Sequence, residues 1–180
     1  STSPWIAENL HLEPAFDKSF NSVGSFPEAY AIAPYFGGNG LRGNDPEIWS
    51  KLRGDIFEER PQGARGAGQD SRLQNVKDQY ALTQRFDIAL VAYEGGQHVG
   101  RNAEAPNKDP RMYDIYIEYL NAIAPYFVTF CHYTHVGTFG DSGSWGAKEY
   151  TGQPEAEAHK YRAMKDWVRD HEAAVIRQRP

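Results

Sequence analysis

A glutamate followed by a pair of glycines, at position 94, is the feature of the sequence that most clearly suggests chemistry. Glu94 ends an apolar run, residues 88–93, that is typical of a buried strand. A carboxylate there costs free energy unless it is hydrogen-bonded or used, and the glycines let the backbone turn sharply and let a ligand approach. Hydrolysis of a glycosidic bond needs such a rigidly held carboxylate, as nucleophile or base. The alternative is a structural carboxylate that caps a helix or pairs with Arg42 or Arg101.

Aromatic and histidine side chains follow the ends of the apolar runs and are candidates for binding a sugar. They are Tyr35, His98, His132, Tyr133 and Trp145. Sugar rings present apolar C–H faces that stack on an indole, and Trp145 has the small, turn-forming neighbours of a loop residue, so it is the candidate platform. Tyr35 fits equally well as a hydrogen-bond partner of Glu94 or as core packing.

A second carboxyl group is harder to find. Glycosidases use two carboxyl groups, one of them as an acid. Asp141 and Glu149 follow the third apolar run and are the candidates for that acid. Glu8 falls within an expected helix, where we predict a solvated position.

Two rival chemistries have weaker support. Histidines with Asp141 could ligate a metal, but His132 and His135 are three residues apart on a strand-to-loop segment and need not point together. The serines near position 143 lack the Gly-x-Ser-x-Gly pattern of a nucleophile elbow. The one cysteine, Cys131, excludes an internal disulfide and an all-cysteine zinc site. We therefore expect no metal and no cofactor.

Three apolar runs must position these side chains. They span residues 30–36, 88–93 and 126–133, and each is followed by a glycine-rich loop and a helix-like stretch. This order predicts parallel strands joined by right-handed βαβ connections, in an α/β fold. Unbroken apolar runs indicate strands buried on both faces. In such folds the active site lies at the carboxyl ends of the strands, where the candidate residues also fall.

Helices are expected where apolar residues recur at helical spacing. Trp49 and Trp167 fall on the apolar faces of two of these stretches and are predicted to be core residues, whereas Tyr93 is predicted to pack on the strand face opposite Glu94. The expected helices span residues 4–12, 46–60, 69–85, 111–123 and 154–176.

The composition limits the partners. The chain has 180 residues, about one domain spanning 1–180, with a formal net charge of −5. This acidic balance argues against nucleic acid or an anionic membrane as the main partner. No apolar run approaches the roughly 20 residues that span a bilayer. The first residues lack a signal-peptide pattern, and since a cleaved one would leave no trace, the compartment stays open.

Residues 90–98 (LVAYEGGQH) resemble the seventh strand of the clan A glycoside hydrolase (β/α)8 barrels, and are most similar to cellulase-like or cellulose-binding bacterial members. Other segments fit the same resemblance: residues 31–38 as the sixth strand, 127–133 as the eighth, 145–150 as the substrate loop and 160–163 as the closing helix. In that clan the catalytic nucleophile ends strand seven, so the resemblance implies that role for Glu94.

The resemblance covers only barrel strands six to eight. The first five strands, and the acid/base glutamate that ends strand four in the clan, have no counterpart in this sequence. The expected fold is therefore a partial (β/α) barrel, with an open α/β sandwich as the alternative. Three parallel strands cannot close on themselves, so one sheet face and both edges would stay open. We expect another copy of the chain, in a homo-oligomer, or a companion chain to cover them.

The leading functional hypothesis is a retaining glycoside hydrolase-like protein that acts on β-linked glycans, with Glu94 as nucleophile. Its acid would come from another chain, and the candidate binding residues would line the sugar subsite. Two alternatives remain: a carbohydrate-binding protein without catalysis, and a truncated barrel that folds only as an oligomer and has no function of its own.

Overall fold

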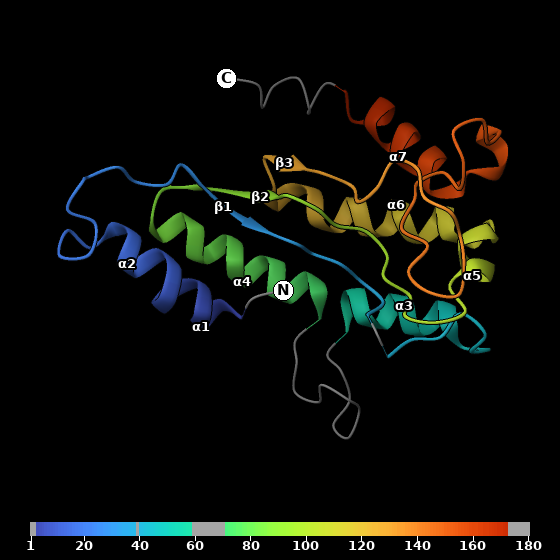
Figure 1. The fold of residues 1–180 in the computed structure, drawn as a ribbon, viewed down its shortest axis with the longest axis horizontal. Helices are drawn as coiled ribbons and strands as arrows, with labels where there is room; N and C mark the ends of the chain where they lie inside the picture. Colours follow the sequence, from blue (N-terminus) through green and yellow to red (C-terminus); the bar gives the residue numbers. More distant parts are fainter. Residues whose placement is uncertain (1–2, 39, 59–70, 173–180) are drawn as a thin grey trace.

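A computed structural model of the chain describes residues 3–38, 40–58 and 71–172, and its centre is a three-stranded parallel sheet in the order β1-β2-β3 (Figure 1). The strands are β1 (Ala29–Ile32), β2 (Ala89–Ala92) and β3 (Thr129–Phe130). All three lie within or next to the predicted apolar runs, and their parallel pairing is confirmed. They are shorter than predicted, because the chain leaves regular pairing soon after each strand.

Helices of different lengths flank this sheet. The N-terminal helical segment consists of α1 (Pro4–Ile6), the π-helical η1 (Ala7–Leu12) and α2 (Glu13–Phe16). The other α-helices are α3 (Ile48–Phe57), α4 (Arg72–Arg85), α5 (Glu104–Lys108), α6 (Arg111–Ile123) and α7 (His159–Asp170). Two 3-10 turns are η2 (Ala124–Tyr126) and η3 (Glu155–Glu157).

Helix α6 has the predicted bounds, and the other boundaries differ for local reasons. Before α3, the Asp45 carboxylate accepts from the Glu47 backbone N–H at 2.9 Å and closes a separate turn, so the helix begins at Ile48. Helix α4 begins after Ser71, whose hydroxyl accepts from the Gln74 N–H at 3.1 Å as an N-cap. The predicted residues 59–60, 69–70 and 173–176 lie outside the described residues.

The N-terminal segment packs on α4 through a small apolar cluster that contains Leu12, Leu82 and Ile88. Glu8 is half-buried here, and its carboxylate pairs with Arg85 of α4. The prediction of a solvated Glu8 was therefore wrong, because η1 lies alongside α4 instead of facing water on that side.

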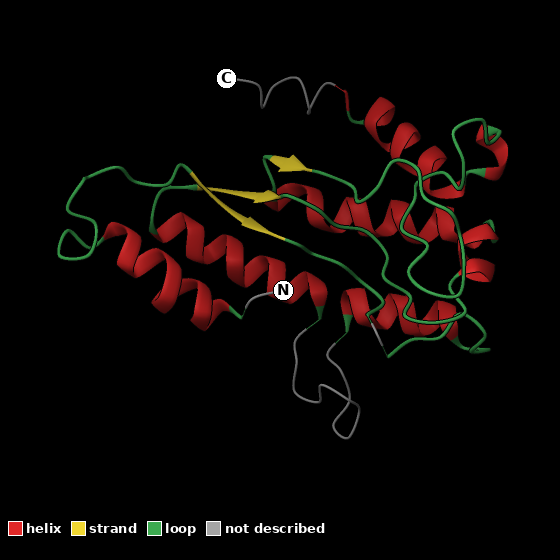
Figure 2. Ribbon diagram, in the orientation of Figure 1, coloured by secondary structure: helices red, strands yellow, loops and turns green. Residues whose placement is uncertain are grey.

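One face of the sheet carries the core. Ile32, Leu90 and Ala92 are buried in the core cluster together with residues of α3, α4 and α6. Figure 2 shows the helices that lie beside the three strands. The alternate residues have different surroundings: Ala31 is exposed and Val91 is half-buried. Within the described residues one face of the sheet is therefore open, as predicted for three parallel strands that cannot close into a barrel, and burial on both faces does not occur there.

The chain is thus a mixed α/β protein with a three-stranded parallel sheet and flanking helices. Trp49 and Trp167 are partly buried against the core, close to their predicted role. Helix α7 packs against α6, beside the β3 side of the sheet. Within the described ranges, no helix has both the length and the apolar character needed to cross a membrane.

Candidate functional site

The segments that follow β1 and β2 stay side by side after the strands end. The Phe36 N–H donates to the Gly96 carbonyl at 3.0 Å, and the His98 N–H donates to the Phe36 carbonyl at 2.7 Å. This pairing places Tyr35, next to Phe36 in the chain, beside Glu94 and His98. The predicted convergence of the strand ends is therefore present in the structure.

Two buried tyrosines of α6 hold all three strand ends from below. The Tyr119 hydroxyl donates to the Pro34 carbonyl at 2.5 Å, after β1. The Tyr116 hydroxyl accepts from the Gln97 N–H at 3.1 Å, after β2, and lies 3.0 Å from Nε2 of His132, after β3. Burial raises the pKa of both tyrosines, so both keep their protons.

The glycine pair after Glu94 has a structural reason. A Cβ at Gly95 would lie 2.8 Å from the Phe130 ring, and one at Gly96 (φ +133°) would lie 2.9 Å from Nε2 of His132. The close approach that these glycines permit is therefore made by the protein's own third strand. The ligand approach that the pattern suggested is not needed to explain them.

Glu94 itself is half-buried, and its carboxylate lies beside the Tyr35 hydroxyl. Burial raises the pKa of Tyr35, and the negative charge of Glu94 raises it further. No cationic side chain in the described ranges pairs with Glu94, so the ion pair considered for Arg42 or Arg101 does not form. These two residues pair with each other through their backbones. Tyr35 is thus a partner of Glu94 and not a core residue.

Aromatic rings extend from this carboxylate in an edge-on series. The His98 ring lies 5.7 Å from Tyr35 and 5.5 Å from Trp145, and Trp145 lies 6.1 Å from Tyr133, between ring centres. Burial and the positive charge of Arg72 lower the pKa of His98, so its ring is neutral at pH 7. The structure therefore brings together four of the five predicted binding residues.

Two exposed tyrosines border this group. Tyr133 is 45% exposed and Tyr93 is 59% exposed. The packing role predicted for Tyr93 was wrong, because its side chain is exposed. Exposed aromatic rings beside a half-buried carboxylate are surfaces on which an amphipathic ring can rest.

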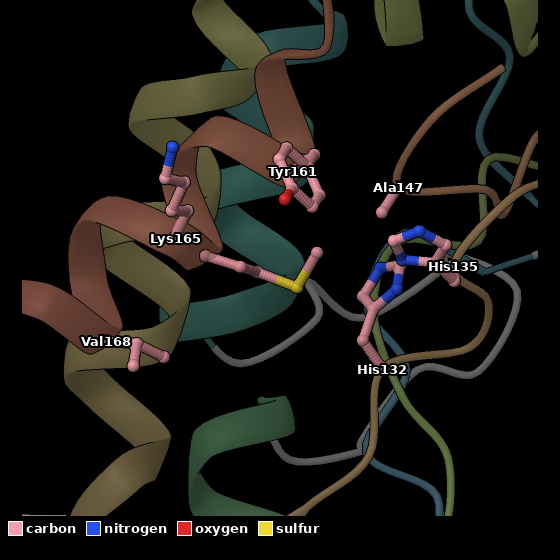
Figure 3. A pocket seen from close by; sticks show the side chains of 7 residues that line it. His132, His135, Ala147, Tyr161, Lys165 and Val168 are labelled. Atoms are coloured by element: carbon pink, nitrogen blue, oxygen red, sulfur yellow. The ribbon is translucent and has the colours of Figure 1, made fainter. Parts of the chain in front are cut away.

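His132 lies apart from this group. Its Nε2 is turned toward Tyr116, and its ring lines a cleft of about 420 Å³ between the segment after β3 and α7 (Figure 3). Burial, with a smaller contribution from the charge of Lys160, lowers the pKa of His132 to about 3, so this imidazole is neutral. Other side chains that line the cleft are His135, Ala147, Tyr161, Met164, Lys165 and Val168.

The two candidate acids have other partners. The Asp141 carboxylate accepts from the Asn102 backbone N–H at 3.1 Å, and Glu149 pairs with Lys108 of α5 at 3.1 Å. Both stabilise the loops around α5, and neither contacts Glu94 or its aromatic neighbours within the described part of the chain. The same part holds no group of three His, Cys, Asp or Glu side chains that could bind a metal.

Two residues that sequence reasoning missed, Gln97 and Lys160, bind the loop that carries Trp145. Gln97 lies inside the motif around Glu94, and this position was the signal that could have identified it. Lys160 gave none, because a lysine in an amphipathic helix is usually solvated.

Comparisons with known proteins identify no relative of this chain, so the site is interpreted from its geometry. The chain matches no protein-family model, no curated protein and no solved structure.

Proposed function

We propose that the strand-end group, which consists of Glu94 with Tyr35, His98, Tyr133 and Trp145, binds a pyranose of a β-linked glycan. We further propose that Glu94 is the nucleophile of a retaining glycoside hydrolase-like reaction. The observation that carries the proposal is the setting of Glu94: a half-buried carboxylate at a strand end, beside the Tyr35 hydroxyl and without a cationic partner in the described residues. A carboxylate whose oxygens are not bound by a cation retains lone pairs for attack. The aromatic rings beside it supply the apolar surface that a sugar needs.

In this mechanism Glu94 attacks the anomeric carbon while a carboxylic acid protonates the leaving oxygen. The glycosidic bond breaks and a glycosyl ester with Glu94 forms. Water then attacks the anomeric carbon of this ester, the former acid takes a proton from that water, and the bond to Glu94 breaks so that Glu94 leaves as a carboxylate. Tyr35 holds the Glu94 carboxylate in one orientation, and Trp145 with His98 supports the sugar ring.

The acid belongs, in this proposal, to a second polypeptide segment that covers the open sheet face and completes a partial barrel. The support is that Asp141 and Glu149 are both bound elsewhere. A carboxyl group about 5–5.5 Å from that of Glu94 in the assembly implies retention of configuration. The partner that we propose is another copy of the chain.

A second candidate function is carbohydrate binding without catalysis. The same observation on Asp141 and Glu149 favours it, since a site with one carboxylate can bind a sugar but has no acid for the leaving group. The two functions share the same binding residues and differ only in turnover.

The substitution Glu94→Gln separates the two functions. With an aryl β-glycoside we expect turnover to fall about a thousandfold or more, whereas the dissociation constant for a β-linked oligosaccharide changes only a few fold. Glu104→Gln, on the exposed face of α5, is the matched control and keeps full turnover. Binding without turnover in the unmodified protein selects the second function, and absence of both overturns the proposal.

Association is tested by light scattering on the unmodified protein. We expect at least a dimer at micromolar concentration, because the sheet has an uncovered face. A monomer that melts in one cooperative transition would remove the partner from the proposal.

A further inference from the structure

The backbone carbonyl of Ser144 accepts hydrogen bonds from two buried side chains. The Gln97 amide nitrogen donates to it at 2.8 Å and to the Gly143 carbonyl at 2.7 Å. The Lys160 ammonium donates to the same Ser144 carbonyl at 2.5 Å. Gln97 and Lys160 are each 1% exposed and come from different parts of the fold, the segment after β2 and helix α7.

These donors hold an unfavourable turn immediately before Trp145. Gly143 has φ +75° and Ser144 has φ +50°, and a non-glycine residue in this region carries a conformational cost. A Cβ at Gly143 would lie 2.6 Å from the Trp145 indole, so the indole rests on the turn itself. The direction of the indole therefore depends on the backbone that Gln97 and Lys160 hold.

Stability alone does not explain Lys160. In the described part of the chain no carboxylate pairs with it, and its ammonium meets only the Ser144 carbonyl and, at 4.6 Å, the Phe139 ring. Burial lowers the pKa of Lys160 well below its ordinary value, because the charged form loses its hydration. What this buried side chain does provide is a hydrogen bond that fixes the carbonyl next to Trp145.

We propose that Gln97 and Lys160 are positioning residues that fix the turn before Trp145 and so keep its indole edge-on to His98, as a rigid platform for the sugar. The sugar part of this inference rests on the proposed function. The positioning part concerns the free protein and stands independently. A platform held in advance binds more tightly, because less conformational entropy is lost when the ligand binds.

Lys160→Met and Gln97→Met test the positioning. Each keeps an unbranched buried side chain and removes the donor. Lys165→Met is the control, since Lys165 is exposed on the same helix and pairs with Glu155. Fluorine NMR of protein labelled with 5-fluorotryptophan reports each tryptophan, and the resonance lost in Trp145→Phe identifies Trp145.

We expect the Trp145 resonance to shift or broaden in both test variants and to stay unchanged in the control. The resonances of Trp5, Trp49 and Trp167 stay in place in all three proteins, because the core is intact. If Lys160→Met does not fold, as judged by near-ultraviolet circular dichroism, Gln97→Met decides the question, and the reverse holds as well. An unchanged Trp145 resonance in a folded test variant overturns the proposal, and failure of both variants to fold overturns it too, since the two residues would then serve the whole fold.

Sugar binding provides the second measurement, with cellotetraose as the probe. We expect each test variant to bind cellotetraose about tenfold more weakly than the unmodified protein. When it is combined with Trp145→Phe, we expect binding no weaker than that of Trp145→Phe alone, because both changes act through one indole. Full additivity in the combined variant contradicts the proposal. If the Trp145 resonance moves but the unmodified protein binds no sugar, the positioning role stands and the proposed function fails.

Discussion

The two faces of the three-stranded sheet are both mostly apolar but have different surroundings. Along β2, Leu90 is buried in the core while its neighbour Val91 is only half-buried. The same alternation occurs in β1, where Ile32 is buried and Ala31 is exposed. Apolar character therefore does not show which face is covered; the positions of α3, α4 and α6 do.

Because of this difference, the candidate site lies between the buried core side of the sheet and its exposed side. The covered side supplies the buried hydroxyls of Tyr116 and Tyr119, which tie down the strand ends. The exposed side of the strand ends displays Tyr93 and Tyr133. The site thus combines a rigid base with an accessible surface, which is what a binding site on a scaffold of parallel strands requires.

Truncation on the covered face should have the largest effect. Leu90 is 1% exposed and lies in the main core, so Leu90→Ala removes buried apolar volume and leaves a cavity. We expect the free energy of unfolding to fall by about 2–5 kcal/mol, measured by urea denaturation. A loss below about 1 kcal/mol would mean that this face is not the core that the structure shows.

Acid should weaken the covered face through His132. Burial lowers its pKa in the folded protein to about 3, from the ordinary histidine value of 6.5, so the unfolded chain binds more protons as the pH falls through this window. Stability is therefore full above pH 6.5 and decreases below it, by about 2 kcal/mol at pH 5 for this group. Urea denaturation at pH 7.5 and pH 5 measures the loss, and His132→Gln should lack this part of it. Equal pH dependence in both proteins would show that His132 titrates normally.

Truncation on the open face should have the smallest effect in a monomer. Val91→Ala removes two methyl groups from a half-buried position, and we expect a loss below about 1 kcal/mol in urea at low protein concentration. A loss as large as that for Leu90→Ala would show that this face is covered in solution. A loss that grows with protein concentration would indicate that another copy of the chain covers it.

Local sequence patterns predicted the bounds of an element best where one continuous apolar face defines the whole element. Helix α6 has the predicted bounds, because its broad apolar face continues without interruption from Met112 to Ile123. Strand β3 is much shorter than its apolar run, because η2 ends at the first residue of the run, Tyr126, and the chain leaves the sheet after Phe130. Apolar character alone does not locate such breaks.

The candidate site was only partly predictable. Glu94 was identified from its neighbours in the chain, and Trp145 from its loop setting. His132 follows a strand, as the other candidates do, but the approach of Tyr116 turns its ring to the opposite side. Asp141 and Glu149 are acidic and correctly placed in the sequence, yet Asn102 and Lys108 bind them.

The sequence by itself determined the α/β class, the parallel strands and the carboxylate at the end of the second strand, because these follow from periodicity and from residue types close together in the chain. The tertiary structure alone decided which sheet face is buried, which side chains surround Glu94, and that Lys160 of α7 reaches the turn before Trp145. These depend on contacts between residues far apart in the chain, and such contacts form only when the helices pack.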